Sequence, residues 1–411
     1  MRIIHLSTSV YDSSAVVRQH LSLLKLGIDS NILTLENHAN PEINNIITVK
    51  QNAVERIINK CIGGIEKLFN IICRVDRYKN MPFSFAIKNV PINKYICKDD
   101  IIHLHWAVGF ISLNQYQKLL NNYKVVVSFH DNFYLTGGCH VKLSCQEYKT
   151  GCKSCPYYRL KYIPHIFYTK KIISEKRKPI LISPSKWMNE NVIASEATKN
   201  GETRIVPNTL NINIFSRQCR EEVRTKLGID NCNVLLFGAV SGVEVKYKGF
   251  NYLIQALLSY QKHNPSDNIV LLVFGSDHIE EKVADIGFPV INLGKIYSMI
   301  ELAKIYSAAD VFIVPSLEDS FNQTVVESLC CETPVVAFKT GGIIENVEHM
   351  KSGFLAEYAD STDLEKGIKW TLQNNQGNRL GKYGRAMMAQ KCNEETVGRQ
   401  LTNIYNYINA K

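Results

Sequence analysis

Two carboxylates, Asp319 and Glu327, flank the predicted start of a helix. Residues 311–314 form a short β-branched run that ends at a proline, and Ser320 or Asn322 can cap the helix that follows. A helix start leaves main-chain N–H groups without partners and gathers partial positive charge, so a phosphate can bind there without a metal. Nearby carboxylates can accept hydrogen bonds from hydroxyl groups. The pattern therefore indicates a ligand that carries both phosphate and hydroxyls, such as a nucleotide sugar.

Two lysines precede this stretch in a comparable position. Lys246 and Lys248 lie between a predicted strand that begins at residue 233 and a helix from about Phe250. An ammonium group at the start of a helix can neutralise a diphosphate. The alternative for each lysine is an ordinary solvated loop residue, and we favour the phosphate role more strongly for Lys248.

Histidines follow two predicted strands in the N-terminal half. Residues 101–104 lead to His105, and residues 125–129 lead to His130 and Asp131. Because the carboxyl ends of parallel strands open on one crevice, both loops should reach a ligand site. A histidine beside an acid at a strand end is a candidate functional residue. We therefore expect a functional role for His130 and core packing for His105.

Four cysteines fall within a short loop rich in Gly, Lys and Tyr: Cys139, Cys145, Cys152 and Cys155. In a reducing compartment, close thiolates favour zinc over disulfides, and a four-thiolate site would fix a long loop that has little core of its own. We expect a structural zinc, with free thiols as the alternative. We do not expect a catalytic zinc, because four protein ligands leave no open coordination position.

The elements that must position these residues alternate between strand and helix. A chain of 411 residues is long enough for two domains of about 200 residues each. The first strand over residues 2–6, a helix over 16–26 and a strand over 32–35 form a βαβ start, which predicts an α/β fold with parallel sheets. Since residue 3 already begins a short strand rather than a signal peptide, we expect a cytoplasmic protein.

The net charge of +10 is compatible with three kinds of partner, namely nucleic acid, an anionic membrane surface and acidic small ligands. We expect no nucleic acid, because neither a zinc-finger pattern nor an aromatic RNA-binding signature occurs. Basic residues gather with aromatic and aliphatic ones between residues 159 and 178, which suits either an anionic membrane surface or a solvated helix face. The basic residues are Arg159, Lys161, Lys170, Lys171, Lys176, Arg177 and Lys178.

A second amphipathic segment covers residues 53–72. Its apolar residues recur at helical spacing, and Gly63 and Gly64 are expected to interrupt the helix. Core packing is the favoured interpretation of its apolar face. A face that meets lipid or a saccharide acceptor is the alternative.

The stretch from Pro315 to Glu327, PSLEDSFNQTVVE, resembles the acidic signature of the retaining GT-B glycosyltransferases of family four. Lys248 with Gly249, His130, and the segment from Pro207 to Asn211 resemble further motifs of that family, and the cysteine loop resembles a loop of polysaccharide glycosyltransferases. The resemblance implies a GT-B fold in which two Rossmann-like domains face an interdomain cleft. It places an acceptor-side domain at 1–207, a donor-binding domain at 208–387 and a returning C-terminal helix at 388–411.

The resemblance also implies a role for each matching residue. The donor sugar would contact His130 and either Asp319 or its neighbour Glu318, while Glu327 would bind the ribose hydroxyls. The pyrophosphate would be held by Lys248 and by the amides of Phe321, Asn322 and Gln323. The end of the strand at Gly294 would contact the base. Ala239 stands where the family has an arginine, and Lys246 is the candidate replacement.

By resemblance, the function is transfer of a sugar, with retention, from a nucleotide-diphosphate sugar to a saccharide acceptor. A lipid-linked acceptor at the inner membrane surface, in bacterial surface polysaccharide synthesis, fits the charge and the expected location. No Asp-x-Asp occurs, so we expect no metal or cofactor in catalysis. Two alternatives stay open, namely a nucleotide-sugar epimerase of the same architecture and a non-catalytic nucleotide-sugar-binding scaffold.

Overall fold

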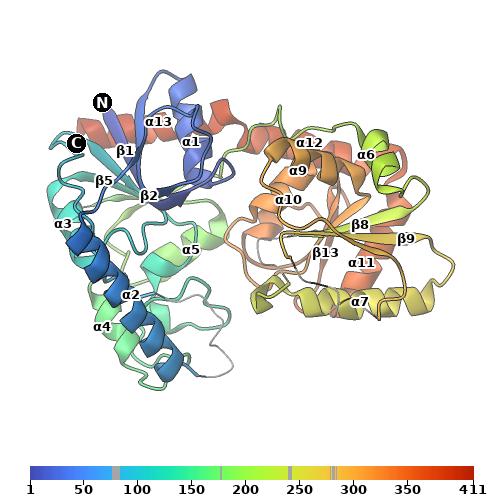
Figure 1. Ribbon diagram of the computed structural model, residues 1–411, viewed down its shortest axis with the longest axis horizontal. Helices are drawn as coiled ribbons and strands as arrows, with labels where there is room; N and C mark the ends of the chain where they lie inside the picture. Colours follow the sequence, from blue (N-terminus) through green and yellow to red (C-terminus); the bar gives the residue numbers. More distant parts are fainter. Residues whose placement is uncertain (76–83, 176–177, 239–242, 278, 280–282, 284) are drawn as a thin grey trace. The chain divides into compact units, whose positions relative to one another are not determined.

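The computed structural model describes the chain except residues 76–83, 176–177, 239–242, 278, 280–282 and 284 (Figure 1). The chain divides into two compact units. Unit 1 contains Met1–Thr209 and Glu394–Lys411, and unit 2 contains Leu210–Asn393. The boundaries expected from the sequence, after residues 207 and 387, lie a few residues earlier in each case.

Unit 1 is built on a seven-stranded parallel sheet in the order β3-β2-β1-β4-β5-β6-β7. Consecutive residues of the central strands enter different clusters: Ile3 packs on one face and Ile4 on the other. Burial of both faces explains why these strands are continuous apolar runs. The strands are β1 (Arg2–Val10), β2 (Asp29–Asn37), β3 (Ile46–Thr48), β4 (Ile101–Leu104), β5 (Lys124–Ser128), β6 (Ile180–Ser183) and β7 (Glu202–Ile205).

The helices of unit 1 include one from the far end of the chain. They are α1 (Ala15–Lys25), α2 (Ala53–Cys73), α3 (Leu113–Asn122), α4 (Ile163–Thr169), α5 (Lys186–Ala194) and α13 (Glu394–Ala410). In Figure 1 α13 lies beside α1, and a Cβ on Gly398 would come within 2.9 Å of Leu26 Cδ1. Leu401 and Tyr405 of α13 join the core cluster that contains Ile3. Unit 1 therefore contains the C-terminal helix, which was expected to pack on the N-terminal domain.

Helix α2 is continuous across Gly63 and Gly64, so the predicted interruption is wrong. A capping box starts the helix: the Asn52 side chain accepts from Glu55 N–H, and the Glu55 carboxylate accepts from Asn52 N–H. Two interior glycines cost roughly 1 kcal/mol each relative to alanine. The cap and the contacts of the helix with its neighbours offset that cost.

Unit 2 contains a six-stranded parallel sheet in the order β10-β9-β8-β11-β12-β13. Leu235 and Leu236, consecutive in β8, enter two different core clusters, so this sheet is also buried on both faces. Its strands are β8 (Asn233–Gly238), β9 (Ile269–Phe274), β10 (Val290–Asn292), β11 (Val311–Val314), β12 (Val335–Phe338) and β13 (Gly353–Ala356).

Helices cover both faces of the second sheet. In Figure 1, α7 and α11 lie on one side and α9, α10 and α12 on the other, in agreement with the two core clusters. The described helices of the unit are α6 (Arg220–Leu227), α7 (Phe250–His263), α9 (Met299–Ala308), α10 (Gln323–Cys330), α11 (Ser361–Asn374) and α12 (Arg379–Cys392). Among the described residues of the whole chain, no helix is long and apolar enough to cross a membrane.

Candidate functional site

A hollow of about 320 Å³ lies in unit 2 where β8 and β11 end and α10 begins. The residues that line it include Ser316, Lys248, Asp319, Asn322, Gln323 and Thr324. The carboxyl edge of a parallel sheet beside a helix start is where α/β folds bind phosphorylated ligands. The structure therefore brings Lys248, Asp319 and the start of α10 together, as the sequence predicted.

Asp319 is the centre of the hydrogen bonds around this hollow. Its Oδ1 accepts from the main-chain N–H groups of Phe321 and Asn322, at 3.2 and 2.7 Å. Its Oδ2 accepts from Lys248 Nζ at 2.9 Å and from Asn322 Nδ2 at 3.1 Å. Two of the three amides assigned to the pyrophosphate are thus bonded to a carboxylate of the chain itself. The same carboxylate engages Lys248, the cation assigned to the pyrophosphate.

Lys248 reaches the hollow because of the glycine that follows it. Gly249 has a φ of +74°, and a Cβ there would lie 1.8 Å from Pro315 O, so only glycine lets the two segments approach this closely. Leu317 N–H donates to Tyr247 O at 2.7 Å and joins the same segments. Burial lowers the pKa of Lys248, but the adjacent Asp319 carboxylate outweighs it and the pKa is raised. The lysine is therefore a fixed cation.

The first turn of α10 places several hydrogen-bond donors at the hollow. Asn322, in the left-handed region at φ +60°, caps the helix by accepting from Val325 N–H at 3.1 Å. The N–H groups of Gln323 and Thr324 lie in the first turn, where the helix itself offers no carbonyl to accept from them. The side-chain amide of Gln323 is buried at the hollow, and within the described residues neither its Nε2 nor its Oε1 has a partner. A buried amide without partners favours a ligand at this place, since leaving it unsatisfied costs free energy.

The structure does not bring every predicted donor-binding residue to the hollow. Glu327 is buried on α10 and accepts from Tyr306 Oη at 3.1 Å. Glu318 is buried and Lys246 is exposed, and neither lines the hollow. Gly294 ends the segment after β10, where its carbonyl accepts from Gly275 N–H at 2.7 Å. The roles of these four residues stay predictions, and Ala239 lies outside the described residues.

In unit 1, His130 is part of a row of histidines. His130 Nε2 lies 2.9 Å from His105 Nδ1, and His105 Nε2 lies 2.9 Å from His5 Nδ1. The three residues come from the ends of β5 and β4 and from β1. The interpretation of His105 as a core residue is correct in burial, but its ring is bonded to the candidate functional histidine. His5 was not singled out, because a lone histidine in a first strand gives no signal without the strand register.

The environment keeps these imidazoles neutral. Burial lowers the pKa of His130 to about 4 and that of the neighbouring His103 to about 3. The pKa values of His5 and His105 lie well below the ordinary value, through burial and the nearby imidazoles. At neutral pH the row therefore carries no charge. His130 fits a role as a hydrogen-bonding group for a sugar better than a role as a cation.

One nitrogen each of His5, His103 and His105 lie within 4.8 Å of one another, the spacing of a metal site. Both nitrogens of His103 are already engaged, with Tyr405 Oη at 2.7 Å and Ser128 Oγ at 2.8 Å. A metal would have to displace one of these partners.

The four cysteines lie in a loop that packs beneath α2 and α4. Cys139 and Cys155 are buried with Cys73 and Tyr158 in one apolar cluster, and Cys145 packs against it. Burial raises the pKa of Cys155 to about 11. No three of the four sulfur atoms gather within 4.8 Å among the described residues. Zinc binding would require these thiols to lose protons, which the raised pKa opposes. Structural zinc stays a prediction.

Lys171 does not belong to the basic surface that the sequence indicated. Its Nζ is fully buried and donates to the carbonyls of Phe133 and Thr136 at 2.7 and 2.8 Å. It fixes the turn between Asp131 and the cysteine loop from inside. Lys176 and Arg177 lie outside the described residues.

Comparison with known proteins adds to this geometry. Residues 232–374 match the model of the family described as Glycosyl transferases group 1. A curated relative is the capsular polysaccharide biosynthesis glycosyltransferase CapM of Staphylococcus aureus. It is 26% identical over 192 residues, which are 45% of this chain and 49% of that protein. The chain spans about half the length of the curated relatives that it matches first.

Solved structures cover the full chain. The superposition on sucrose-phosphate synthase of Thermosynechococcus elongatus has a TM-score of 0.68 at 18% sequence identity. It covers 100% of this chain and 100% of the synthase. The Anabaena protein HepE, solved in complex with UDP-glucose, has a TM-score of 0.65 at 15% identity, over 99% of this chain and 100% of HepE. These likenesses and the two parallel sheets confirm the predicted α/β, two-domain GT-B fold class.

Proposed function

We propose that this chain is a glycosyltransferase that moves a sugar, with retention, from a nucleotide-diphosphate sugar to a saccharide acceptor. The observation that carries the proposal is the hollow at the start of α10. There a fixed ammonium group, the first N–H groups of α10 and the Gln323 side-chain amide converge, and within the described part of the chain that amide has no partner. The glycosyl transferases group 1 match over residues 232–374, which include this hollow, supports the same assignment.

The chemistry would depend on a change of partner at Lys248. A diphosphate that enters the hollow brings more negative charge than the Asp319 carboxylate, so Lys248 can turn to it while Asp319 keeps the amides of Phe321 and Asn322. The main-chain N–H groups of Gln323 and Thr324 and the Gln323 amide would hold the phosphate oxygens. These groups stabilise the charge that develops as the diphosphate leaves.

The freed Asp319 oxygen would then accept a hydrogen bond from a sugar hydroxyl. Glu318, the second candidate for this contact, is buried next to it. The roles that the resemblance implies for His130, Glu327 and Gly294 belong to this proposal, whereas Lys246, which is exposed and outside the hollow, is left out of it. Because these groups supply charge and hydrogen bonds without a metal-binding acid pair, the proposed reaction needs no metal or cofactor.

The acceptor that we propose is a lipid-linked saccharide at the inner membrane face, in surface polysaccharide synthesis. The Staphylococcus aureus relative CapM is a glycosyltransferase of capsular polysaccharide biosynthesis, which supports this choice. The basic character of the chain supports an acceptor at an anionic surface.

A thermal-shift screen of nucleotide sugars tests the proposal. A ligand that binds only the folded chain raises the melting temperature with its affinity and concentration. We expect one nucleotide-diphosphate sugar to raise it, and the corresponding nucleoside without phosphates to have little effect. Incubation of that donor alone then separates the alternatives, because an epimerase converts the donor without an acceptor and a scaffold does not consume it. No shift with any donor would contradict the proposal.

A further inference from the structure

Helix α2 presents a long apolar stripe to solvent. Seven of its aliphatic side chains are between 51% and 66% exposed: Val54, Ile57, Ile58, Ile65, Leu68, Ile71 and Ile72. At 3.6 residues per turn these positions fall on one side of the helix. The sequence favoured core packing for this face, and that interpretation is wrong, because the core contacts of α2 come from a different and narrower side.

The acidic residues of α2 face the protein, and its basic residues face solvent. Glu55 closes the capping box, and Glu66 Oε1 accepts from Phe85 N–H at 2.6 Å, so both acids are bonded to the protein. Arg56, Lys60 and Lys67 are all exposed, and helical spacing places them along one edge of the stripe. The outward side of the helix is therefore apolar with a basic border.

Specific contacts fix this orientation. Asn59 donates from Nδ2 to Asn89 O at 3.0 Å and accepts from Asn89 N–H at 3.2 Å. Near the other end, Tyr158 donates to the Asn70 side chain, and Phe69 packs against Phe85 and Tyr158. Since both ends of α2 are anchored, the stripe is held toward solvent.

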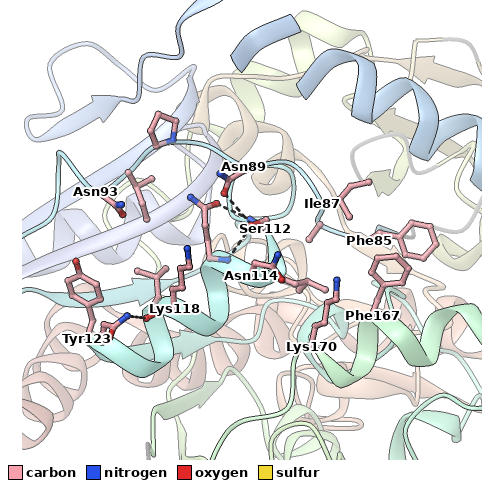
Figure 2. Close-up of a pocket in the computed structure, with 17 residues that line it drawn as sticks. Phe85, Ile87, Asn89, Asn93, Ser112, Asn114, Lys118, Tyr123, Phe167 and Lys170 are labelled. Atoms are coloured by element: carbon pink, nitrogen blue, oxygen red, sulfur yellow. Dashed lines mark hydrogen bonds between the residues drawn. The ribbon is translucent and has the colours of Figure 1, made fainter. Parts of the chain in front are cut away.

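The surface next to α2 has the same character. Helix α4 packs on the same cluster as α2, through Ile163 and Phe167, while Ile166 is exposed and Lys170 follows the helix. A hollow of about 820 Å³ is lined by Phe167 of α4 and by Asn89, which is bonded to Asn59 of α2. Figure 2 shows Phe85, Ile87 and Phe167 at one end of it, with Lys118 and Lys170 along its length. Apolar groups and exposed ammonium groups thus continue beyond α2.

We propose that the α2 stripe docks on an anionic lipid bilayer, with α2 lying in the plane of the interface. An apolar helix face with a basic border gains both from burial among acyl chains and from attraction to acidic headgroups. A second copy of the chain would meet the stripe with the same basic border, which repels itself. The charges therefore favour lipid over self-association.

That this bilayer is the inner face of a bacterial membrane rests on the proposed function, but the lipid contact does not involve the donor hollow. The proposed function and the lipid contact can therefore be contradicted independently of each other. Flotation with vesicles of phosphatidylglycerol and phosphatidylethanolamine measures the lipid contact without any donor. We expect binding to these vesicles, weakening with added salt, and little binding to phosphatidylcholine vesicles.

Leu68→Glu tests the stripe itself. Leu68 and Ile193, which lies on α5, are both 59% exposed, so Ile193→Glu is a matched control. We expect Leu68→Glu to reduce the vesicle partition coefficient by roughly tenfold or more, because the interface loses an apolar side chain and gains a charge. Ile193→Glu should leave it unchanged. Both variants should keep the thermal unfolding and the nucleotide-sugar shift of the unmodified chain.

Three results would overturn the inference. One is the absence of binding to anionic vesicles, and another is equal loss of binding in the two variants. The third is a concentration-dependent dimer, seen by light scattering, that Leu68→Glu dissociates, because the stripe would then be the interface between two copies. A chain that binds vesicles but shifts with no nucleotide sugar would contradict the proposed function and leave the lipid contact standing.

Discussion

At the scale of single residues, the geometry of the candidate site depends on the hydrogen bonds of the Asp319 carboxylate. The sequence predicted correctly that Asp319, Lys248 and the start of α10 lie together, because strand ends and helix caps are local signals. It did not predict that the carboxylate accepts from Phe321 and Asn322 N–H. That turn requires a positive φ at Asn322, and asparagine tolerates this conformation without specifying it.

Lys248→Ala tests the proposed diphosphate contact. We expect turnover to fall by two to three powers of ten, since removing one stabiliser of developing charge costs about 3 to 4 kcal/mol. Steady-state kinetics with the donor found in the thermal-shift screen measures the effect.

Lys246→Ala is the matched control, because Lys246 lies in the same turn but is exposed and outside the hollow. Its turnover should change by less than about threefold if only the lysine at the hollow stabilises charge. Equal losses in the two variants would show that both lysines act, as the resemblance implied. An unchanged rate in Lys248→Ala would move the diphosphate elsewhere.

At the scale of elements, the close approach of the Lys248 turn to the end of β11 sets the position of the cation. Gly249→Ala should destabilise unit 2 by roughly 2 to 4 kcal/mol, from the left-handed φ and from overlap with Pro315 O. Gly228, at φ +68° with nothing within 4 Å of a built Cβ, separates the two causes.

Gly228→Ala should therefore cost only about 1 kcal/mol, the part that comes from φ alone. Denaturant unfolding measures both free energies. If the two variants lost equal stability, the contact with Pro315 would be irrelevant. The donor affinity of Gly249→Ala should also fall, because Lys248 would move with its neighbour.

Most strands and helices were predictable from periodicity and capping residues, but the environment of α2 was not. Its apolar spacing is equally compatible with a core and with an exposed stripe, because a 3.6-residue period does not say what the face meets. The partners that orient it, such as Asn89 and Phe85, are about 20 to 30 residues away along the chain. The same limit applies to Lys171, whose burial no local pattern indicates.

At the scale of the whole molecule, register brings distant histidines together. His5 pairs with His103 across β1 and β4, and His105 lies two residues further on the same face. The sequence supplied the strands but not this pairing, so only His130 was assigned a role. The cluster as a whole is thus a product of sheet order.

This cluster should make the stability of unit 1 depend on pH. The unfolded chain binds protons at an ordinary histidine pKa near 6.5, whereas the folded pKa is about 4 for His130 and about 3 for His103. The unfolded state therefore binds more protons in this range, and stability falls as the pH drops below 6.5 and continues to fall toward 3 to 4. At pH 5 each residue should cost about 2 kcal/mol.

Fluorescence can follow unit 1 by itself. Of the three tryptophans, Trp106 and Trp187 lie in unit 1, so Trp370→Phe leaves only reporters of that unit. Denaturant unfolding at pH 7 and pH 5 should give a smaller free energy at pH 5, and His130→Asn should reduce the difference. A profile that is flat between these values would contradict the neutral, buried state of the cluster.

The placement of α13 has a consequence for how the chain is made. Unit 2 is continuous in sequence, whereas unit 1 needs both the first 209 residues and the segment from Glu394, whose Tyr405 bonds to His103. During synthesis, the later half can therefore complete its core while the earlier half still lacks a helix that covers one face of its sheet. The N-terminal portion emerges first from the ribosome and finishes last, and a chaperone would meet its uncovered sheet in the interval.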